Sequence, residues 1–293
     1  MKKIFWIIFG LLFGIILLLF IISLVKAIQL KSSLEKNEYL ISESFNKIDI
    51  DVDTDVINIY ASDNDVDKVI VVENKSIVVE TQVINNTLII KRVDKRNFFD
   101  RLFSFGKYQI DLYLSNEIIE SLDIESSTGN ITINKGLTFG NVEIEGSTGN
   151  IAFSSNVNKN MNIEISTGNV NIKDSLVLGA VEIEASTGNI NLENVNCESL
   201  EIEISTGKTK LTNVIVAKDL NVEGSTGDVI FDGFDAENIN INLSTGDVKG
   251  TIITSKFFIV NTDTGKKSVP ETKDGGTCRI NTDTGDINIS YYK

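Results

Sequence analysis

A tripeptide ending in Thr-Gly returns about every twenty residues and limits what this chain can fold into. Seven copies read Ser-Thr-Gly, and the last two read Asp-Thr-Gly. A fixed period of this length is typical of stacked-repeat proteins, in which each repeat contacts only its neighbours. We interpret each copy as a structural corner, formed by Thr128, Gly129, Thr148, Gly149, Thr167, Gly168, Thr187, Gly188, Thr206, Gly207, Thr226, Gly227, Thr245, Gly246, Thr264, Gly265, Thr284 and Gly285.

Apolar and polar residues alternate on both sides of each glycine. Counted from the glycine as offset zero, offsets −7, −5 and −3 are apolar or small, as in Leu200, Ile202 and Ile204. Offsets +2 and +4 are usually apolar, as in Ile190 and Leu192. A period of two predicts a half-buried strand on each side. The inward-facing residues fall on odd offsets before the glycine and on even offsets after it. We therefore expect the chain to bend there, with the threonine facing inward.

These patterns predict an all-β fold, a parallel β-solenoid (β-helix) of about nine regular coils of ~19.5 residues each. We divide the chain into a transmembrane anchor (1–26), a juxtamembrane linker (27–46), an irregular β cap with the first coils (47–118) and the regular solenoid (119–293). The stretch Ile48–Ile59 fits the repeat in degenerate form, with Asp55 in the place of the glycine. Offset −3 alternates between small and large residues, which predicts an interlocked core.

The amino-terminal segment has the length and composition of a membrane anchor. Residues Ile4 to Val25 carry no charge and are flanked by Lys2, Lys3 and Lys26. As a helix they would span ~33 Å, enough for the hydrocarbon core of a bilayer. A cleaved signal peptide is the alternative, but its apolar run is usually shorter. We expect a single-pass cell-membrane protein with an extracytoplasmic β domain, and Gly10 and Gly14 offer a self-association face.

The composition argues against several classes of function. The formal net charge is −14, so we expect no nucleic-acid partner. The chain has no histidine, and no phosphate-binding loop or Cys/His metal spacing occurs, so we expect no cofactor and no established metal site. Cys197 and Cys278 are predicted to be separate free thiols. Asp263 and Asp283 sit in Asp-Thr-Gly motifs like those of aspartic proteases, but their repeat positions face solvent, and we expect no enzyme activity.

The most informative surface pattern is acidic. Offset −4 carries glutamate in six successive copies, and offset −6 adds further acids. In stacked coils these would form columns with neighbours ~4.8 Å apart. A solvated face screened by salt is one interpretation; a strip that binds cations or basic peptides is the other. Its candidate residues are Glu125, Glu145, Glu164, Glu184, Glu203, Glu223, Asp123, Glu143, Glu182 and Glu201.

The sequence resembles a bacterial family known as the "putative adhesin" or LiaG-like β-strand-repeat domain. The likeness is carried by the apolar segment Ile4–Val25, the strand pair Ile48–Ile59, the stretch Tyr108–Leu114 leading into Leu122–Ile131, and the recurring Ser-Thr-Gly copies. The resemblance implies a membrane-associated β-solenoid of the cell envelope, with some members linked to envelope stress. No catalytic residues are established for that family, so none are carried over.

Two hypotheses follow for the function. The first is a non-enzymatic, membrane-anchored interaction module, adhesin-like or stress-linked, that binds a protein, a cationic peptide or an envelope polymer. The second is a structural scaffold that polymerises through the solenoid ends. A carbohydrate-active solenoid enzyme is a weaker third, because its acids would have to converge in a groove and these run in straight columns.

Overall fold

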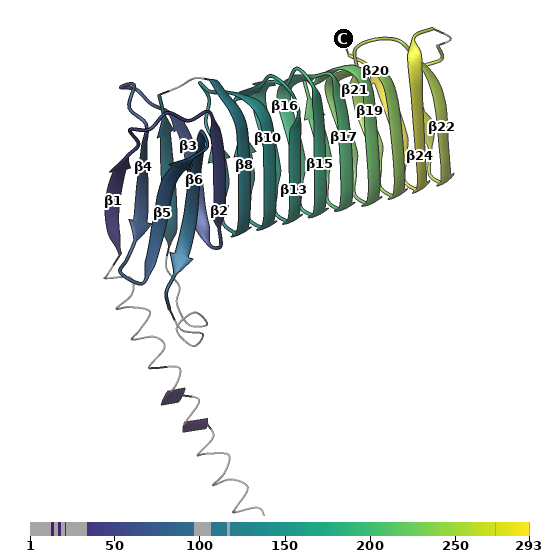
Figure 1. The fold of residues 1–293 in the computed structure, drawn as a ribbon. Coiled ribbons are helices and arrows are strands. Elements are labelled where there is room, and N and C mark those ends of the chain that lie inside the picture. Colours follow the sequence, from purple (N-terminus) through teal and green to yellow (C-terminus); the bar gives the residue numbers. More distant parts are fainter. Residues whose placement is uncertain are drawn as a thin grey trace, which may run out of the picture.

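The computed structural model describes residues 13, 14, 17, 18, 21, 34–96, 107–115, 118–272 and 274–292. These form an all-β parallel solenoid of about eight turns (Figure 1). About nine regular coils were predicted, so the observed number is slightly lower. The copy at Gly265 is followed by only a two-residue strand, β23 (Lys267–Ser268). The predicted anchor lies almost wholly outside the described residues. Within the described part, no helix is long and apolar enough to cross a membrane.

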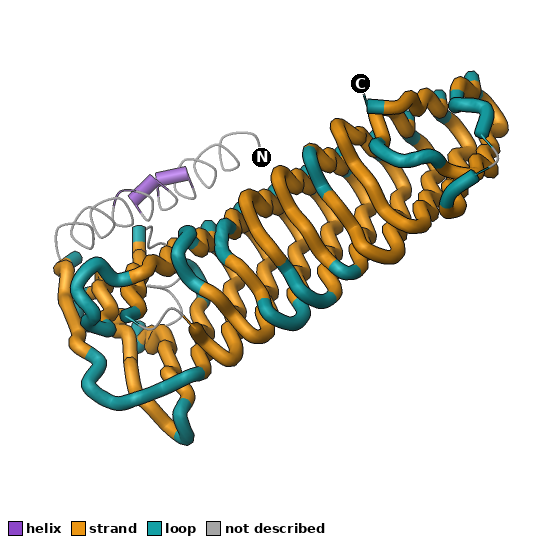
Figure 2. The backbone as a smooth tube through the Cα atoms, turned by 90° about the horizontal axis from the view of Figure 1, so that it is seen from above, coloured by secondary structure: helices purple, strands orange, loops and turns teal. Residues whose placement is uncertain are grey.

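Two stacks of strands run the length of the solenoid, and the tube view shows successive coils following one another along the axis (Figure 2). One stack contains the strands that lead into the corners. In spatial order these are β6 (Thr87–Asp94), β2 (Lys47–Val52), β8 (Ile118–Thr128), β10 (Thr138–Thr148), β13 (Met161–Thr167), β15 (Ala180–Thr187), β17 (Ser199–Thr206), β19 (Ile215–Thr226), β20 (Val229–Thr245), β24 (Gly276–Thr284) and β22 (Lys256–Thr264).

The other stack contains the strands that leave the corners. In spatial order these are β7 (Tyr108–Leu114), β3 (Asp55–Ala61), β9 (Ile131–Ile133), β11 (Ile151–Phe153), β14 (Val170–Leu176), β16 (Ile190–Cys197), β18 (Thr209–Thr212), the start of β20, β21 (Val248–Ile252), β25 (Ile287–Tyr291) and β23. The short β12 (Asn156–Val157) pairs with β10. Apolar side chains from both stacks fill one continuous core.

Each corner is built on a glycine for a steric reason. At Gly149 the backbone has φ of 146°, a conformation that other residues rarely adopt. Its N–H donates to the carbonyl of Thr167 on the next coil at 2.9 Å. The adjoining glycines repeat this geometry, so the backbones of successive corners stack in close contact. The degenerate first copy joins this stack, because Asp55 lies against Gly129 as another glycine would.

The orientation predicted for the threonines is wrong. All nine corner threonines are exposed. The bend includes the serine and the threonine before the glycine. The alternation of inward and outward side chains therefore ends before the threonine, and not at it as predicted. The ladder shows this, because it pairs Gly146 with Ile165 and Thr148 with Thr167 but omits the serines between them. Offset −3 is therefore the last core-facing position before the corner.

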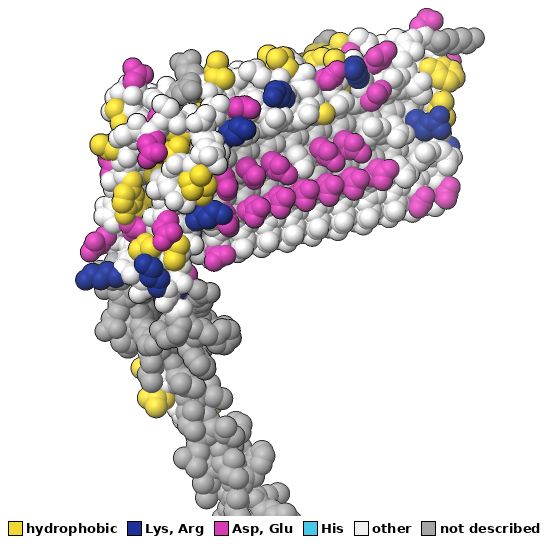
Figure 3. Space-filling model, viewed as in Figure 1, with side chains coloured by type: hydrophobic (Ala, Val, Ile, Leu, Met, Phe, Trp, Pro, Cys, Tyr) yellow, Lys and Arg dark blue, Asp and Glu magenta, His cyan; other side chains and the backbone are white. Residues whose placement is uncertain are grey.

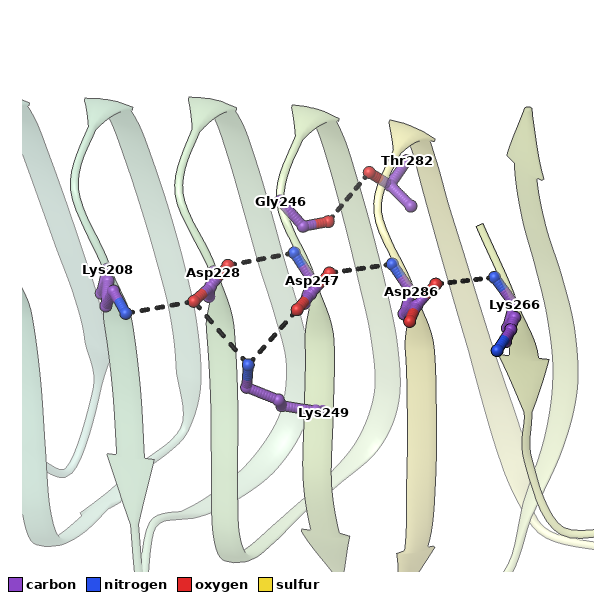
Figure 4. Close-up of polar contacts among 8 residues, drawn as sticks. All are labelled: Lys208, Asp228, Gly246, Asp247, Lys249, Lys266, Thr282 and Asp286. Atoms are coloured by element: carbon purple, nitrogen blue, oxygen red, sulfur yellow. Dashed lines mark hydrogen bonds and ion pairs between the residues drawn. The ribbon is translucent and has the colours of Figure 1, made fainter. Parts of the chain in front are cut away.

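At the residue after the corner glycine, side-chain amides and carboxylates form hydrogen bonds between successive coils. At offset +1, the side chain of Asn150 accepts hydrogen bonds from the main-chain N–H of Asn169 at 3.0 Å and from its amide group at 2.9 Å. Asp247 and Asp286 continue the pattern further along (Figure 4). Lys208 interrupts it, since a lysine offers no acceptor.

At the carboxyl end, the last two copies do not stack in sequence order. β24 lies between β20 and β22, so the final copy is inserted ahead of the one that precedes it. In Figure 4 the N–H of Asp286 bonds to Asp247 at 2.9 Å, and the N–H of Lys266 bonds to Asp286 at 2.8 Å. The outermost rung of the solenoid is therefore β22, and not the segment that ends at Tyr291.

A similar inversion occurs at the amino end. The first copy, β2 and β3, is covered by the later strands β6 and β7. Antiparallel strands then complete that end: β5 (Ile77–Ile84) pairs with β6, β4 (Lys68–Glu73) pairs with β7, and β1 (Glu35–Leu40) pairs with β4. Asp55 and Arg92 form a buried ion pair between the first copy and this layer.

The two cysteines are free, as predicted, and both are buried. Burial raises the pKa of the Cys197 thiol to about 12, and burial likewise raises that of Cys278 to about 12. Because the thiolate is the reactive form, both are inert core residues at neutral pH.

Candidate acidic groove

The strand register brings the offset −4 glutamates side by side. Glu125 pairs with Glu145, and the ladder continues through Glu164, Glu184, Glu203 and Glu223. All six are exposed. Figure 3 shows the result as rows of acidic side chains running along one face of the solenoid.

The offset −6 acids form a second, interrupted column. Asp123 pairs with Glu143, and Glu182 pairs with Glu201. Asn162 stands between Glu143 and Glu182, so the column contains one neutral rung. The ten predicted residues therefore lie on one continuous face and do not converge on a point.

Two members of these columns were missed. Asp49 pairs with Asp123 and Asp51 pairs with Glu125, which extends both columns by one rung toward the amino end. The signal was present in the sequence, because the degenerate first copy already placed these residues at offsets −6 and −4. That copy lacks the corner glycine, which marks the repeat position in the other copies.

A shallow groove follows the offset −4 column, with a volume of about 640 Å³. The glutamates line one wall and the corner serines, from Ser127 to Ser244, line the other. The floor is the offset −3 column, where Gly146, Ala185 and Gly224 alternate with larger side chains. Ser126 also lies in the floor, and its buried hydroxyl has no hydrogen-bond partner. The groove thus offers carboxylates and hydroxyls on opposite sides of an apolar strip.

Crowding of like charges changes the acidity of this face. Burial, followed by the neighbouring carboxylates Glu143 and Asp49, raises the pKa of Asp123 to about 6. Partial burial and the adjacent Glu164 raise the pKa of Glu145, and the same causes raise the pKa of Glu184. Burial and the neighbouring like charges both disfavour the ionised carboxylates, so a positive partner would stabilise the charged columns.

The charge of the groove is limited at both ends. Lys91 on the next strand toward the amino end lies 3.3 Å from Asp51. Toward the carboxyl end, asparagines replace the glutamates at offset −4, in the order Asn242, Asn281 and Asn261. The acidic stretch therefore runs from Asp51 to Glu223, over seven rungs.

The arrangement can attract positive charge along a line. In the part of the chain that the structure describes, no group of three acidic or sulfur side chains is placed to hold a metal ion. Asp263 and Asp283 lie on adjacent rungs and are both exposed. They occupy the same repeat position as the serines of the groove, beyond Ser244 at its carboxyl end. An exposed, solvated pair does not provide the shared proton that aspartic-protease chemistry requires.

The fold is similar to those of several solved structures. A "putative adhesin" from Bacteroides fragilis is 17% identical with a TM-score of 0.53, and the match covers 88% of this chain and 97% of that one. A "putative adhesin" from Parabacteroides distasonis is 16% identical with a TM-score of 0.58, over 88% and 97%. A "putative lipid binding protein" from the same species is 16% identical with a TM-score of 0.55, over 87% and 97%.

These identities show a common fold and nothing finer. No curated protein matches the sequence. The resemblance noted from the repeats is confirmed at the level of the family. The profile described as Toastrack DUF4097 matches residues 45–216 and 177–293, and the chain belongs to that family.

Proposed function

We propose that this chain is a non-enzymatic, membrane-anchored protein of the cell envelope whose solenoid binds an extended, positively charged partner along the acidic groove. One observation carries the proposal: seven acidic residues in register, from Asp51 to Glu223, border a continuous groove with an apolar floor. Solvation of the charges alone does not account for a groove beside them. The membrane anchor is proposed from the sequence alone.

A basic peptide suits this groove better than a single metal ion. The carboxylates form a line and not a cage, whereas Ca²⁺ prefers six to eight oxygens around one point. A line of charge matches a chain that carries several ammonium or guanidinium groups. The apolar floor would contact the methylene groups of lysine or arginine side chains. The serine wall would supply hydrogen-bond partners for the peptide backbone.

The acidic stretch sets the size of the partner. Six intervals of ~4.8 Å make about 29 Å, which corresponds to roughly nine residues of extended peptide. Binding of this kind is largely electrostatic, so its affinity should fall steeply as salt is raised.

The test measures binding of nine-residue lysine-rich peptides to the full chain by calorimetry. The triple variant Glu164→Gln, Glu184→Gln, Glu203→Gln should weaken binding about tenfold or more, since each lost charge pair near a surface is worth a fraction of 1 kcal/mol or more. The control triple variant Glu193→Gln, Glu198→Gln, Glu237→Gln makes the same change in net charge outside the groove. It also removes two surface ion pairs, Glu193 with Lys173 and the half-buried Glu198 with Lys218. It should leave affinity nearly unchanged.

Two outcomes would refute the proposal. One is the absence of any binding by cationic peptides at low salt. The other is equal loss of affinity in both triple variants, which would mean a response to net charge alone. A parallel titration with Ca²⁺ separates metal binding from peptide binding. Protease accessibility in intact cells tests the proposed location outside the cytoplasm.

The scaffold hypothesis has one specific observation in its favour, the uncovered outermost strand β22. That strand supports pairing at one end of the solenoid.

A further inference from the structure

In the described part of the chain, the solenoid presents four sheet edges, two at each end, and they differ in how they are protected. An exposed edge strand invites pairing with another chain, and natural proteins usually blunt it with charges, proline or very short strands. At the amino end, β1 carries Glu35, Lys36 and Glu38, and β5 carries the exposed Glu80 near its centre. At the carboxyl end, β23 is only two residues long and is closely followed by Pro270.

The fourth edge, β22, is longer, and its own charged residues, Lys256 and Asp263, lie near its two ends. It is nine residues long, and no charged residue or proline occurs between Phe257 and Thr262. Among the described strands, β22 pairs with β24 on one side and also contacts the short β23.

The strand lies at the yellow end of the ribbon (Figure 1). Two of its carbonyls accept side-chain hydrogen bonds, that of Lys256 from Thr272 Oγ1 and that of Val260 from Lys267 Nζ at 3.5 Å. Lys267, which belongs to β23, also reaches the Asn261 side chain at 3.5 Å.

The side chains of β22 are also unusual for their positions. Phe257 and Ile259 point outward and are 47% and 41% exposed. Ile259 occupies offset −6, where the other rungs carry acids, amides or an arginine. The inward-facing Phe258 and Val260 are only half-buried, because no further rung covers them. The strand is therefore apolar on both faces at the one place where the core is open.

The position of β22 leaves it accessible. The described amino-terminal strand β1 lies at the opposite end of the solenoid. The last strand of the chain, β25, is held between β21 and β23, and the N–H of Tyr292 bonds to Ile252. Insertion of the final copy one rung inward thus keeps the described carboxyl-terminal residues away from this edge.

We propose that β22 is the contact surface for a second copy of this chain, paired antiparallel about a two-fold axis at Ile259. In that register Ile259 faces its own counterpart, and Phe258 faces Val260 of the second copy. Each copy has an open core end and each offers the apolar strand that would cover the other. No like charges meet between Phe257 and Asn261, so the strand is complementary to itself.

The other edges make the predicted assembly a closed dimer. A filament would need a second usable surface on each molecule, and the remaining three edges are blunted. The proposal thus narrows the scaffold hypothesis to one contact per molecule. It is independent of peptide binding in the acidic groove, which lies along the side of the solenoid.

Cysteine cross-linking of the full chain in mild detergent tests the contact and its register. Phe257→Cys, Ile259→Cys and Asn261→Cys each place one thiol on the outward face of β22. Ile259→Cys should form a disulfide-linked dimer on mild oxidation, whereas the other two should cross-link chiefly when mixed with each other. Asn240→Cys, at the same offset on an interior rung, is the matched control. The native cysteines are buried and inert.

A second measurement uses sedimentation of the uncross-linked protein. Wild type should show dimers that the double variant Phe257→Lys, Ile259→Lys abolishes, with unchanged circular dichroism because both side chains are exposed. Cross-linking of Ile259→Cys no faster than Asn240→Cys, or monomers alone at high concentration, would overturn the proposal. So would a dimer that survives the lysine variant and is lost in Gly10→Leu, Gly14→Leu, since that dimer would belong to the amino-terminal segment.

Discussion

The carbonyl oxygen of Gly129 lies 1.9 Å from the point at which a β-carbon on Gly149 would sit. The same contact recurs at the corners on either side, between Gly149 and Gly168 and between Gly168 and Gly188. A β-carbon at that distance cannot be accommodated unless backbone moves. The glycine column therefore fixes the distance between coils, and the exposed threonines beside it are not needed for that purpose.

Gly149→Ala should destabilise the solenoid by about 2 kcal/mol or more, because it adds a backbone clash to an unfavourable φ. Gly146→Ala, three residues earlier, is the matched control. The nearest atom to its added β-carbon would be the Ile165 side chain at 3.6 Å, an ordinary contact. Urea denaturation should show a large loss for the first variant and little change for the second. Equal losses would contradict the steric account.

Gly146→Ile tests the interlocked core. Ile165 on the next rung already lies over Gly146, so a second branched side chain should overpack this part of the core. We expect a loss of about 1–3 kcal/mol, measured as a lower urea midpoint than that of Gly146→Ala. Unchanged stability would mean that the small and large residues at offset −3 are not packed against each other.

Much of this fold could be predicted because its determinants are local. The period of two on either side of Gly149 defines the strands, and the constant spacing defines the register that aligns Glu145 with Glu164. Both follow from residues within one repeat. The orientation of Thr148 could not be predicted in this way, because the sequence pattern does not show how many residues a bend occupies.

The order of the last two rungs could not be predicted either. The copies at Gly265 and Gly285 both read Asp-Thr-Gly, so their local patterns suit either place in the stack. Which one lies outermost depends on long-range packing. A signal was present in the outward apolar residues Phe257 and Ile259, which fit an end rung, but it has meaning only once the inversion is known.

The ion pair between Asp55 and Arg92 should be important for the amino-terminal end. Both side chains are buried, with 0% and 3% exposed, and Arg92 also lies over the ring of Tyr108. Removing one partner leaves an uncompensated buried charge, at a cost of about 3–5 kcal/mol. Asp55→Ala and Arg92→Leu should each show this loss in urea denaturation. The double variant should lose much less than the sum, and strict additivity would contradict the pairing.

The amide ladder at the corners should contribute a smaller amount. Asn150→Ala removes an acceptor for two hydrogen bonds from Asn169, and about 1 kcal/mol or somewhat more should be lost. Lys208→Ala is the matched control, because it occupies the same offset but accepts nothing; it loses only an exposed ion pair with Asp228 at 3.2 Å. Thermal unfolding of the two variants should differ in midpoint. A control that loses as much as Asn150→Ala would refute the ladder's role.

The acidic columns should make the protein more stable at mildly acidic pH than at pH 7.5. Asp123 has a folded pKa of about 6, above its ordinary value of 3.8. Between those values the folded state binds protons more readily than the unfolded state, so stability rises as the pH falls through this window. Glu145 and Glu184 shift in the same direction.

Below that window the trend should reverse. Although burial acts to raise it, the N–H of Asp247 together with Lys208 and Lys249 lowers the pKa of Asp228 (Figure 4). Stability from such a group is present above its unfolded pKa and is lost as the pH falls through the lower folded value. The thermal midpoint should therefore pass through a maximum at about pH 4. Asp123→Asn should raise the midpoint at pH 7.5 and flatten its change between pH 4 and 6. A midpoint that falls steadily from pH 7.5 to 5 in wild type would contradict a stabilising effect of protonating Asp123 and its neighbours in the columns.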